Sequence, residues 1–244
     1  MKNLADIHSH MLWGLDDGAQ TREEMIAMMT QAYEDGIRTI CFTPHFEPDG
    51  FAYSSDTVAL RFTEAKKYAA EHFEELSLFL GSEISYRNDA VDFLRDGRCP
   101  TIAGGRYVLL DFFGASDFKQ MVSAIDQLWC GGYIPVVAHV ERYDFVYKKF
   151  AELASLSRDG VLFQVNSRSL IYAEKTSRER KMAEKLLAHG VVDIIASDSH
   201  DPKMRKPSLS VCYDYVATKY GAEYAQALFY TNPMAVIEND SIQV

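Results

Sequence analysis

Apolar side chains recur along the chain in seven short, nearly continuous runs, most of which are rich in residues that favour strands. The runs are LADIHS (4–9), RTICFTP (38–44), LSLFLGSE (76–83), YVLLDFF (107–113), YIPVVAH (133–139), VLFQVNS (161–167) and VVDIIAS (191–197). Continuous rather than alternating hydrophobicity predicts strands that are buried on both faces, as in a parallel sheet.

Helical patterns lie between most of these runs. The clearest covers 21–36, where Thr21 and Glu24 have the spacing of a capping box and Gly36 can end the helix. Its apolar residues recur at helical spacing, as Met25, Met28, Met29 and Tyr33. Similar patterns cover 56–75, 116–132 and 177–190. This alternation predicts an α/β fold with parallel strands and right-handed crossovers, and its continuity predicts a single domain over residues 1–244.

Polar side chains stand at the ends of the predicted strands, and five of the seven histidines lie at such ends. His8 and His10 are two residues apart, so both rings project from one strand face. The other polar residues at or just after strand ends are Asp6, Asp16, Asp17, His45, Glu83, Asp111, His139, Gln164, Asn166, Asp198 and His200. Ligands of parallel α/β sheets bind beyond the carboxyl ends of the strands, so these side chains are expected to meet there. The turn-rich segment 47–56 is expected to border the same site.

Taken singly, most of these residues have an ordinary explanation. A lone histidine such as His45 is usually a hydrogen-bonded core residue, and Asp16 and Asp17 before a glycine are typical of a turn. Five histidines and four carboxylates at one end of a sheet are different, because buried carboxylates are unfavourable unless paired or bound to metal. Imidazole and carboxylate suit Zn, Mn and Fe, so the pattern predicts a metal centre. His72 and His189 lie in helical stretches and are assigned no role.

The number of candidate ligands predicts two or three divalent ions, since a catalytic site uses about three such ligands per ion. Neighbouring ions about 3.5–4 Å apart can stabilise the entering and leaving oxygens of a phosphoryl transfer, and a metal-bound water supplies the nucleophile. Arg142 lies three residues after His139, and Arg205 lies five after His200. Both are candidate phosphate ligands, because a guanidinium binds phosphate oxygens as a bidentate fork.

The acidic composition narrows the range of partners. With a formal net charge of −10, neither a nucleic-acid backbone nor an anionic membrane surface is an expected partner. No leader pattern precedes ADIHSH, and no apolar stretch is long enough to cross a bilayer, so no membrane insertion is expected. The four cysteines form no CxxC pair and are expected to be reduced thiols of a cytoplasmic protein.

Two other phosphate chemistries are not supported. Cysteine-based tyrosine phosphatases have five residues between the catalytic cysteine and an arginine, whereas six separate Cys99 from Arg106. The chain also lacks a GxxxxGK[ST] loop, so a P-loop nucleotide site is not expected.

The motifs DIHSHMLWGLDDG, TICFTPH, YVLLDF, IPVVAHVERY, QVNS and IIASDSH resemble the polymerase and histidinol phosphatase (PHP) superfamily. More narrowly, over residues 4–215, they resemble the bacterial PHP-type protein tyrosine phosphatases of capsule and exopolysaccharide loci. The resemblance implies a distorted seven-stranded β/α barrel around three metal ions, commonly manganese. It further implies activity on the tyrosine-rich tail of a bacterial tyrosine kinase, which would be a separate partner.

The resemblance also implies how the ligands are shared among the ions. One ion would be held by His8, His10, Glu83 and Asp198, the second by Glu83, Asp111 and His139, and the third by Asp17, His45 and His200. Arg142 and Arg205 match the phosphate-binding arginines, and His45 or His200 could assist departure of the tyrosinate. The family usually has Glu in place of Asp111, which is shorter by about 1.5 Å. The second ion is therefore expected to be displaced, to bind more weakly or to gain a water.

Two alternatives stay open. One is a small-molecule phosphomonoesterase such as a histidinol phosphatase, although that branch usually has His near the position of Asp111. The other is a binding or regulatory module with little turnover, which would normally lack some of the ligands. The sequence does not distinguish Mn from Fe or Zn, and it leaves a homo-oligomer as an alternative to a monomer.

Overall fold

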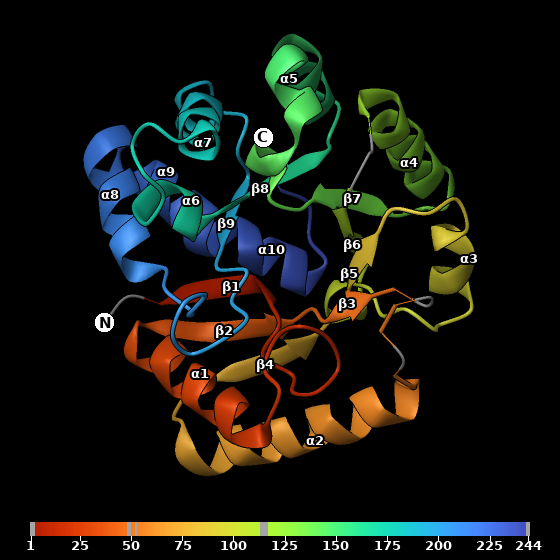
Figure 1. Cartoon of the computed structure of the whole chain (residues 1–244), viewed down its shortest axis with the longest axis vertical. Helices are drawn as coiled ribbons and strands as arrows, with labels where there is room; N and C mark the ends of the chain where they lie inside the picture. Colours follow the sequence, from red (N-terminus) through yellow and green to blue (C-terminus); the bar gives the residue numbers. More distant parts are fainter. Residues whose placement is uncertain (1–2, 48–49, 52, 113–116, 243–244) are drawn as a thin grey trace.

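The fold consists of parallel strands that alternate with helices along the chain (Figure 1). The computed structural model describes residues 3–47, 50–51, 53–112 and 117–242. The strands in this part of the chain are β1 (Leu4–Ser9), β2 (Ile37–Phe42), β3 (His45–Phe46), β4 (Ser77–Leu80), β5 (Glu83–Ser85), β6 (Tyr107–Asp111), β7 (Ile134–Val137), β8 (Leu162–Asn166) and β9 (Ile194–Ala196).

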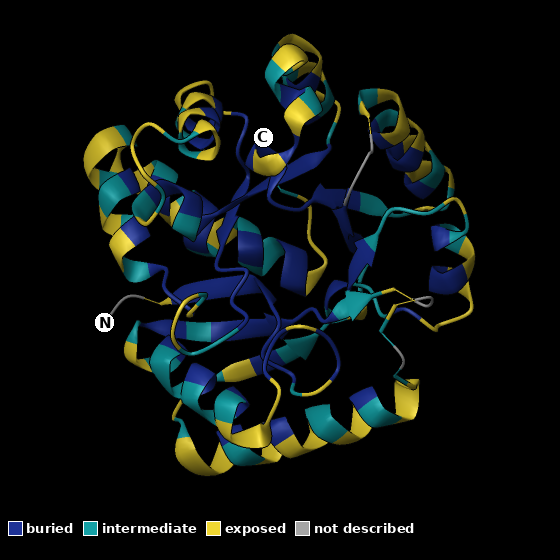
Figure 2. Cartoon of the chain, in the orientation of Figure 1, coloured by how far each residue is buried: buried dark blue, intermediate teal, exposed yellow. Residues whose placement is uncertain are grey.

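Most of the helices surround the strands and turn their exposed faces to solvent, whereas the strands are largely buried (Figures 1 and 2). The helices are α1 (Arg22–Glu34), α2 (Ser55–His72), α3 (Ala90–Arg95), α4 (Phe118–Cys130), α5 (Phe150–Arg158), α6 (Ser167–Ile171), α7 (Arg178–Ala188), α8 (Ser210–Tyr220), α9 (Ala222–Gln226) and α10 (Asn232–Glu238). Three short 3₁₀ turns and a π-helical turn complete the structure, at Ile102–Gly104, Val140–Arg142, Asp144–Lys148 and Ala227–Thr231. No described helix is long and apolar enough to span a bilayer.

The predicted helix over 21–36 is confirmed as α1, with one local difference. Thr21 Oγ1 accepts the N–H of Glu24, and Gly36 follows the helix with a φ of +94°. The Glu24 carboxylate accepts the N–H of Gln20 instead of that of Thr21, so the expected capping box is shifted by one residue. The predicted positions Phe113 and Ser116, and parts of the segment 47–56, lie outside the described residues.

Every predicted strand run contains an observed strand, but the run 76–83 is interrupted, and the run 38–44 is followed by a further short strand, β3, beyond its predicted end. β2 and β3 are separated by Thr43 and Pro44, because proline has no N–H to donate to the sheet, and β4 and β5 are separated at Gly81. Gly81 N–H donates to Phe42 O (2.8 Å) and Glu83 N–H donates to Pro44 O (3.1 Å), so the two runs stay side by side across the breaks. Because of these breaks, the described part of the chain contains nine strands, whereas seven were expected.

The strands form two parallel sheets. One has the order β1-β2-β4, and the other has the order β3-β5-β6-β7-β8-β9 and curls as half of a barrel. The sheets meet at the ends of β1 and β9, where His10 N–H donates to Ser199 O (2.8 Å) and Asp198 N–H donates to His8 O (2.9 Å). The carboxyl ends of both sheets are therefore gathered in one region.

Hydrophobic packing on both faces of the strands holds this arrangement. An inner cluster joins strands of the two sheets to α10, which crosses the space encircled by the strands in Figure 1. Its buried members include Ile7, Tyr107, Leu109, Val136, Ile194 and Ile237. A larger outer cluster fills the space between the strands and the surrounding helices. Packing on both faces explains the continuous hydrophobicity of the strands and makes them a rigid support for the side chains at their ends.

Candidate metal centre

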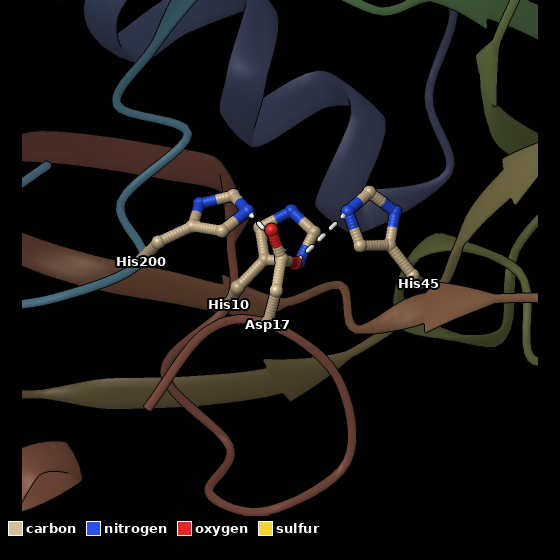
Figure 3. A group of neighbouring side chains, drawn as sticks. All are labelled: His10, Asp17, His45 and His200. Atoms are coloured by element: carbon tan, nitrogen blue, oxygen red, sulfur yellow. Dashed lines mark ion pairs between the residues drawn. The ribbon is translucent and has the colours of Figure 1, made fainter. Parts of the chain in front are cut away.

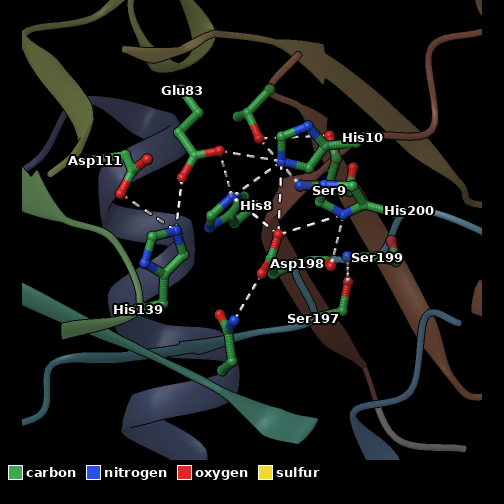
Figure 4. A network of polar contacts seen from close by, with 12 residues as sticks. His8, Ser9, His10, Glu83, Asp111, His139, Ser197, Asp198, Ser199 and His200 are labelled. Atoms are coloured by element: carbon green, nitrogen blue, oxygen red, sulfur yellow. Dashed lines mark hydrogen bonds and ion pairs between the residues drawn. The ribbon is translucent and has the colours of Figure 1, made fainter. Parts of the chain in front are cut away.

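The histidines and carboxylates predicted from strand ends meet in one cluster (Figure 4), although His45 and Glu83 begin the short strands β3 and β5 instead of ending a strand as expected. His8 belongs to β1, and His10 follows it directly. Glu83 is the first residue of β5, since the break in its run precedes it. His139 and Asp198 each follow a strand by two residues, β7 and β9 respectively. Segments far apart in the sequence thus supply one polar cluster.

Glu83 lies at the centre of this cluster and is fully buried. Its Oε2 is 3.3 Å from His8 Nε2, 3.2 Å from His10 Nε2 and 3.1 Å from His45 Nδ1. Its Oε1 is 2.8 Å from His139 Nε2. One carboxylate therefore contacts four imidazoles, which is the arrangement expected of a residue that bridges ions.

Asp17 forms the outer side of the cluster (Figure 3). Its Oδ1 lies 3.4 Å from His45 Nε2 and 3.4 Å from His200 Nε2, and its side chain is 55% exposed. Asp17, in the loop after β1, thus lies between the cluster and the solvent and contacts both.

The described residues contain three groups whose nitrogen or oxygen atoms lie within 4.8 Å of one another and could hold an ion. They are His10 with Asp17, His45 and His200; His8 with His10 and Asp198; and His8 with Glu83 and His139. These groups overlap the three expected ligand sets closely. Asp111 is absent from all of them: its Oδ1 is 3.8 Å from His139 Nε2 and accepts a hydrogen bond from Tyr143 OH (2.8 Å).

The nitrogen and oxygen atoms of the cluster are better suited to binding divalent cations than to hydrogen bonding among themselves. Six buried side-chain atoms of the described residues lack a hydrogen-bond partner, and two of them, Glu83 Oε2 and His200 Nε2, belong to this cluster. Buried polar atoms without partners are unfavourable and rare, and they occur here at the centre of a cluster of imidazoles and carboxylates. Cations would satisfy both atoms, and imidazole with carboxylate is a suitable donor set for Mn, Fe or Zn.

Electrostatics within the cluster shift its pKa values strongly. Burial by itself would lower the pKa of His8, but the nearby Glu83 and Asp198 carboxylates outweigh burial and raise the pKa to about 9. Burial by itself would also lower the pKa of His45, but the nearby Asp17 and Glu83 carboxylates outweigh it and raise the pKa to about 11. Burial would raise the pKa of Glu83, yet His8 and the other imidazoles hold it well below its usual range. Metal ions would have to displace protons from these imidazoles.

Two residues of the cluster have left-handed backbone conformations, with φ of +31° at His139 and +52° at Asp198. Such conformations are strained for residues other than glycine and concentrate at functional sites. Both residues lie two positions after a strand, so the strained turn directs each side chain into the cluster.

Further hydrogen bonds orient three of the imidazoles so that each presents Nε2 to the cluster. The Nδ1–H group of His10 donates to Asp16 Oδ2 (2.7 Å), and that of His8 donates to Gln164 Oε1 (3.0 Å). The Nδ1–H group of His200 donates to its neighbour's backbone oxygen, Asp198 O (3.0 Å). Hydrogen bonds of this kind fix ring orientation in metal sites.

Tyr143 orients a further pair of residues. Its hydroxyl donates to Asp111 Oδ1 (2.8 Å) and accepts from His139 Nδ1 (3.3 Å) and from Phe112 N–H (3.0 Å). The sequence placed this tyrosine in the motif IPVVAHVERY but indicated no role for it. The strand-end position of Gln164 did indicate a role, and the Asp16 carboxylate, which resembled an ordinary turn residue, is buried beneath His10.

A cavity of about 400 Å³ opens onto the cluster. Arg142 and Arg205 line it beside the cluster, and both donate to Asp198 Oδ2, at 3.1 and 2.9 Å respectively. The predicted phosphate ligands therefore stand at the mouth of the candidate metal centre. Cys99 is buried and its thiol pKa is raised to about 12, so a thiolate nucleophile is not available there.

Comparisons with known proteins agree with this geometry. The tyrosine-protein phosphatase CpsB of Streptococcus pneumoniae is 32% identical over 243 residues, which cover 98% of this chain and 100% of that protein. The tyrosine-protein phosphatase YwqE of Bacillus subtilis is 26% identical over 247 residues, covering 98% of this chain and 93% of that protein. A chain from the crystal structures of these two proteins, described as unique metal-dependent tyrosine phosphatases, superposes with a TM-score of 0.89 at 25% identity, covering 98% of this chain and 96% of the other.

The model of one protein family, described as "Capsular polysaccharide synthesis, CpsB/CapC", matches residues 4–238. That match spans the strands, the candidate metal ligands and both arginines. The chain therefore belongs to the CpsB/CapC family of capsular polysaccharide synthesis.

Proposed function

We propose that this chain is a metal-dependent protein-tyrosine phosphatase, and hence a phosphoric monoester hydrolase. The observation that carries the proposal is Glu83, a fully buried carboxylate with four imidazoles around it, beside a cavity that two arginines line. Membership in a family with metal-dependent tyrosine phosphatases supports the same conclusion.

The proposed ligands are those expected from the sequence. As the resemblance implied, His8, His10, Glu83 and Asp198 would hold one ion, Glu83, Asp111 and His139 a second, and Asp17, His45 and His200 a third. Asp111 would approach the second ion from further away, because Tyr143 OH already occupies its Oδ1. We propose Mn as the metal, since the donor set is compatible with it and the resemblance favours it.

The chain's own residues account for the rest of the chemistry. Bound ions would supply Lewis-acid charge and an acidified water for attack on phosphorus. Arg142 and Arg205 would turn from Asp198 towards the phosphoryl oxygens and stabilise the charge that develops there. Asp17, at the solvent-exposed side of the cluster, would hold His45 and His200 near the leaving group.

The same proposal extends to the substrate and to the architecture. The phosphotyrosine would belong to the tail of a bacterial tyrosine kinase that controls capsular or exopolysaccharide synthesis. The two sheets would together form one distorted seven-stranded barrel of the PHP type, as a single domain over residues 1–244. The backbone bonds between β1 and β9, and those across the two strand breaks, support that closure.

One experiment separates this proposal from its main rival. The manganese-loaded protein is assayed for phosphate release from a phosphotyrosine peptide and from histidinol phosphate, with and without chelator. Faster turnover of the peptide, abolished by chelator and by Glu83→Gln, is the expected result. Faster turnover of histidinol phosphate would contradict it and would move the function to small-molecule metabolism.

A further inference from the structure

One side of the cavity is aromatic, and neither the metal ligands nor the arginines account for it. Phe112, Tyr143 and Phe145 line the cavity together with the polar cluster. The rings of Phe112 and Tyr143 meet edge-on with centroids 5.7 Å apart, and those of Tyr143 and Phe145 stack at 5.4 Å with an interplanar angle of 6°. We call these three residues the aromatic wall. Phe112 and Tyr143 are buried, whereas Phe145 is half-buried and partly open to solvent.

The aromatic wall is joined directly to the candidate metal centre. Tyr143 bonds Asp111 and His139 through its hydroxyl, and its ring centroid is 5.7 Å from that of His139. A group bound to ions at His139 would therefore have the wall beside it. A phosphate ester at the ions would place the first atoms of its alcohol portion against these rings.

The segment that carries Phe145 also contacts a neighbouring helix. Arg178 of α7 donates to Asp144 Oδ1 (2.6 Å), next to Phe145, and its guanidinium lies 3.8 Å from the centre of the Tyr147 ring. A preformed apolar surface beside a few placed polar groups is the usual composition of a small-ligand pocket.

We infer that the aromatic wall is a binding subsite for the aryl ring of a phosphate ester, and that Phe145 determines selectivity for aryl over alkyl phosphates. This inference rests on the proposed phosphatase function and adds the residues that would select its aryl substrate. Aromatic rings gain from offset-stacked or edge-to-face contact with one another, and an aliphatic chain lacks that gain. The phosphate would be held identically in both classes, so discrimination would come from the wall.

The test measures binding of non-hydrolysable ligands, because aryl esters also react faster for reasons of leaving-group chemistry. Dissociation constants of benzylphosphonate and ethylphosphonate are measured by calorimetry on the manganese-loaded full chain. The variants are Phe145→Leu and, as a matched control, Phe118→Leu. Phe118 is in the same aromatic cluster, 6.3 Å from Phe145 between ring centroids, but does not line the cavity. Thermal unfolding of both variants checks that they are folded.

Phe145→Leu is expected to weaken benzylphosphonate binding about tenfold and to leave ethylphosphonate binding unchanged, with no change in Phe118→Leu. Unchanged benzylphosphonate binding in Phe145→Leu, or an equal loss in both variants, would overturn the inference. The ratio of kcat/KM for phosphotyrosine and phosphoserine peptides should fall in parallel. A wild-type chain that hydrolyses no phosphate ester would refute the proposed function, whereas turnover with unchanged selectivity in Phe145→Leu would refute the subsite alone.

Discussion

Asp16→Asn is the sharpest test of how the fold prepares the candidate metal centre. The Asp16 carboxylate is buried and accepts three hydrogen bonds, from His10 Nδ1 (2.7 Å), His45 N–H (2.8 Å) and Gly18 N–H (2.9 Å). The asparagine side chain has nearly the same shape but only one acceptor oxygen. If that oxygen serves the two histidines, its NH₂ group faces the N–H of Gly18, so at least one buried donor is left unpaired.

The expected loss follows from these contacts. An unpaired buried donor costs about 1–3 kcal/mol. His10 would also lose a charged acceptor for a neutral one, and changes in hydrogen bonds that orient metal-bound imidazoles lower metal affinity by about 10- to 100-fold. That range equals about 1.4–2.7 kcal/mol of binding free energy. Turnover at saturating metal should recover most of its wild-type value, because Asp16 is proposed to position His10 without touching the substrate.

The assay is manganese titration against a competing chelator, followed by phosphotyrosine-peptide turnover as a function of manganese concentration. Asp35→Asn is the matched control, since Asp35 also accepts three hydrogen bonds, from Leu209 N–H, Ser210 N–H and Ser210 Oγ, but belongs to no candidate ligand group. Asp35→Asn should have a lower free energy of unfolding than the wild type and an unchanged affinity for manganese. A metal affinity of Asp16→Asn within twofold of the wild type would refute the positioning role.

Three further predictions follow from the same geometry. Glu83→Gln should lower turnover by about 10³-fold or more, because it removes a charge that stabilises the reacting centre by several kcal/mol. Metal analysis of this variant should find at least one ion fewer per chain, and full activity would contradict the bridging role of Glu83. Arg142→Lys keeps the positive charge but removes the guanidinium that can bind two phosphate oxygens at once. The kcat/KM for a phosphotyrosine peptide should therefore fall about 10- to 100-fold, with unchanged metal content. Asp193 is buried and its pKa is raised from 3.8 to about 7, so it is more readily protonated in the folded than in the unfolded chain. The free energy of unfolding should therefore fall by about 2 kcal/mol as pH rises from 5 to 7. Denaturant titrations at the two pH values should find this decrease in the wild type and not in Asp193→Asn.

Sequence patterns predicted the elements of this protein and the identity of most of the residues in its polar cluster. Continuous apolar runs marked the strands because packing on both faces leaves no polar side. His10 and His200 could be selected because ligand sites of parallel sheets lie at strand ends. The strand breaks at Pro44 and Gly81 were not anticipated, since a run of mixed apolar residues does not show where hydrogen bonding to its neighbour stops.

Only the tertiary structure decided which residues orient the cluster and which form the wall of the cavity. Asp16 is buried beneath His10 rather than exposed in a turn, because the loop after β1 folds back over the strand ends. The role of Tyr143, which follows β7, depends on Asp111 at the end of β6 and on the ring of Phe112 just after it. Strand ends are encoded by local hydrophobicity, whereas contacts between loops depend on how the two sheets meet, which no short stretch of sequence contains.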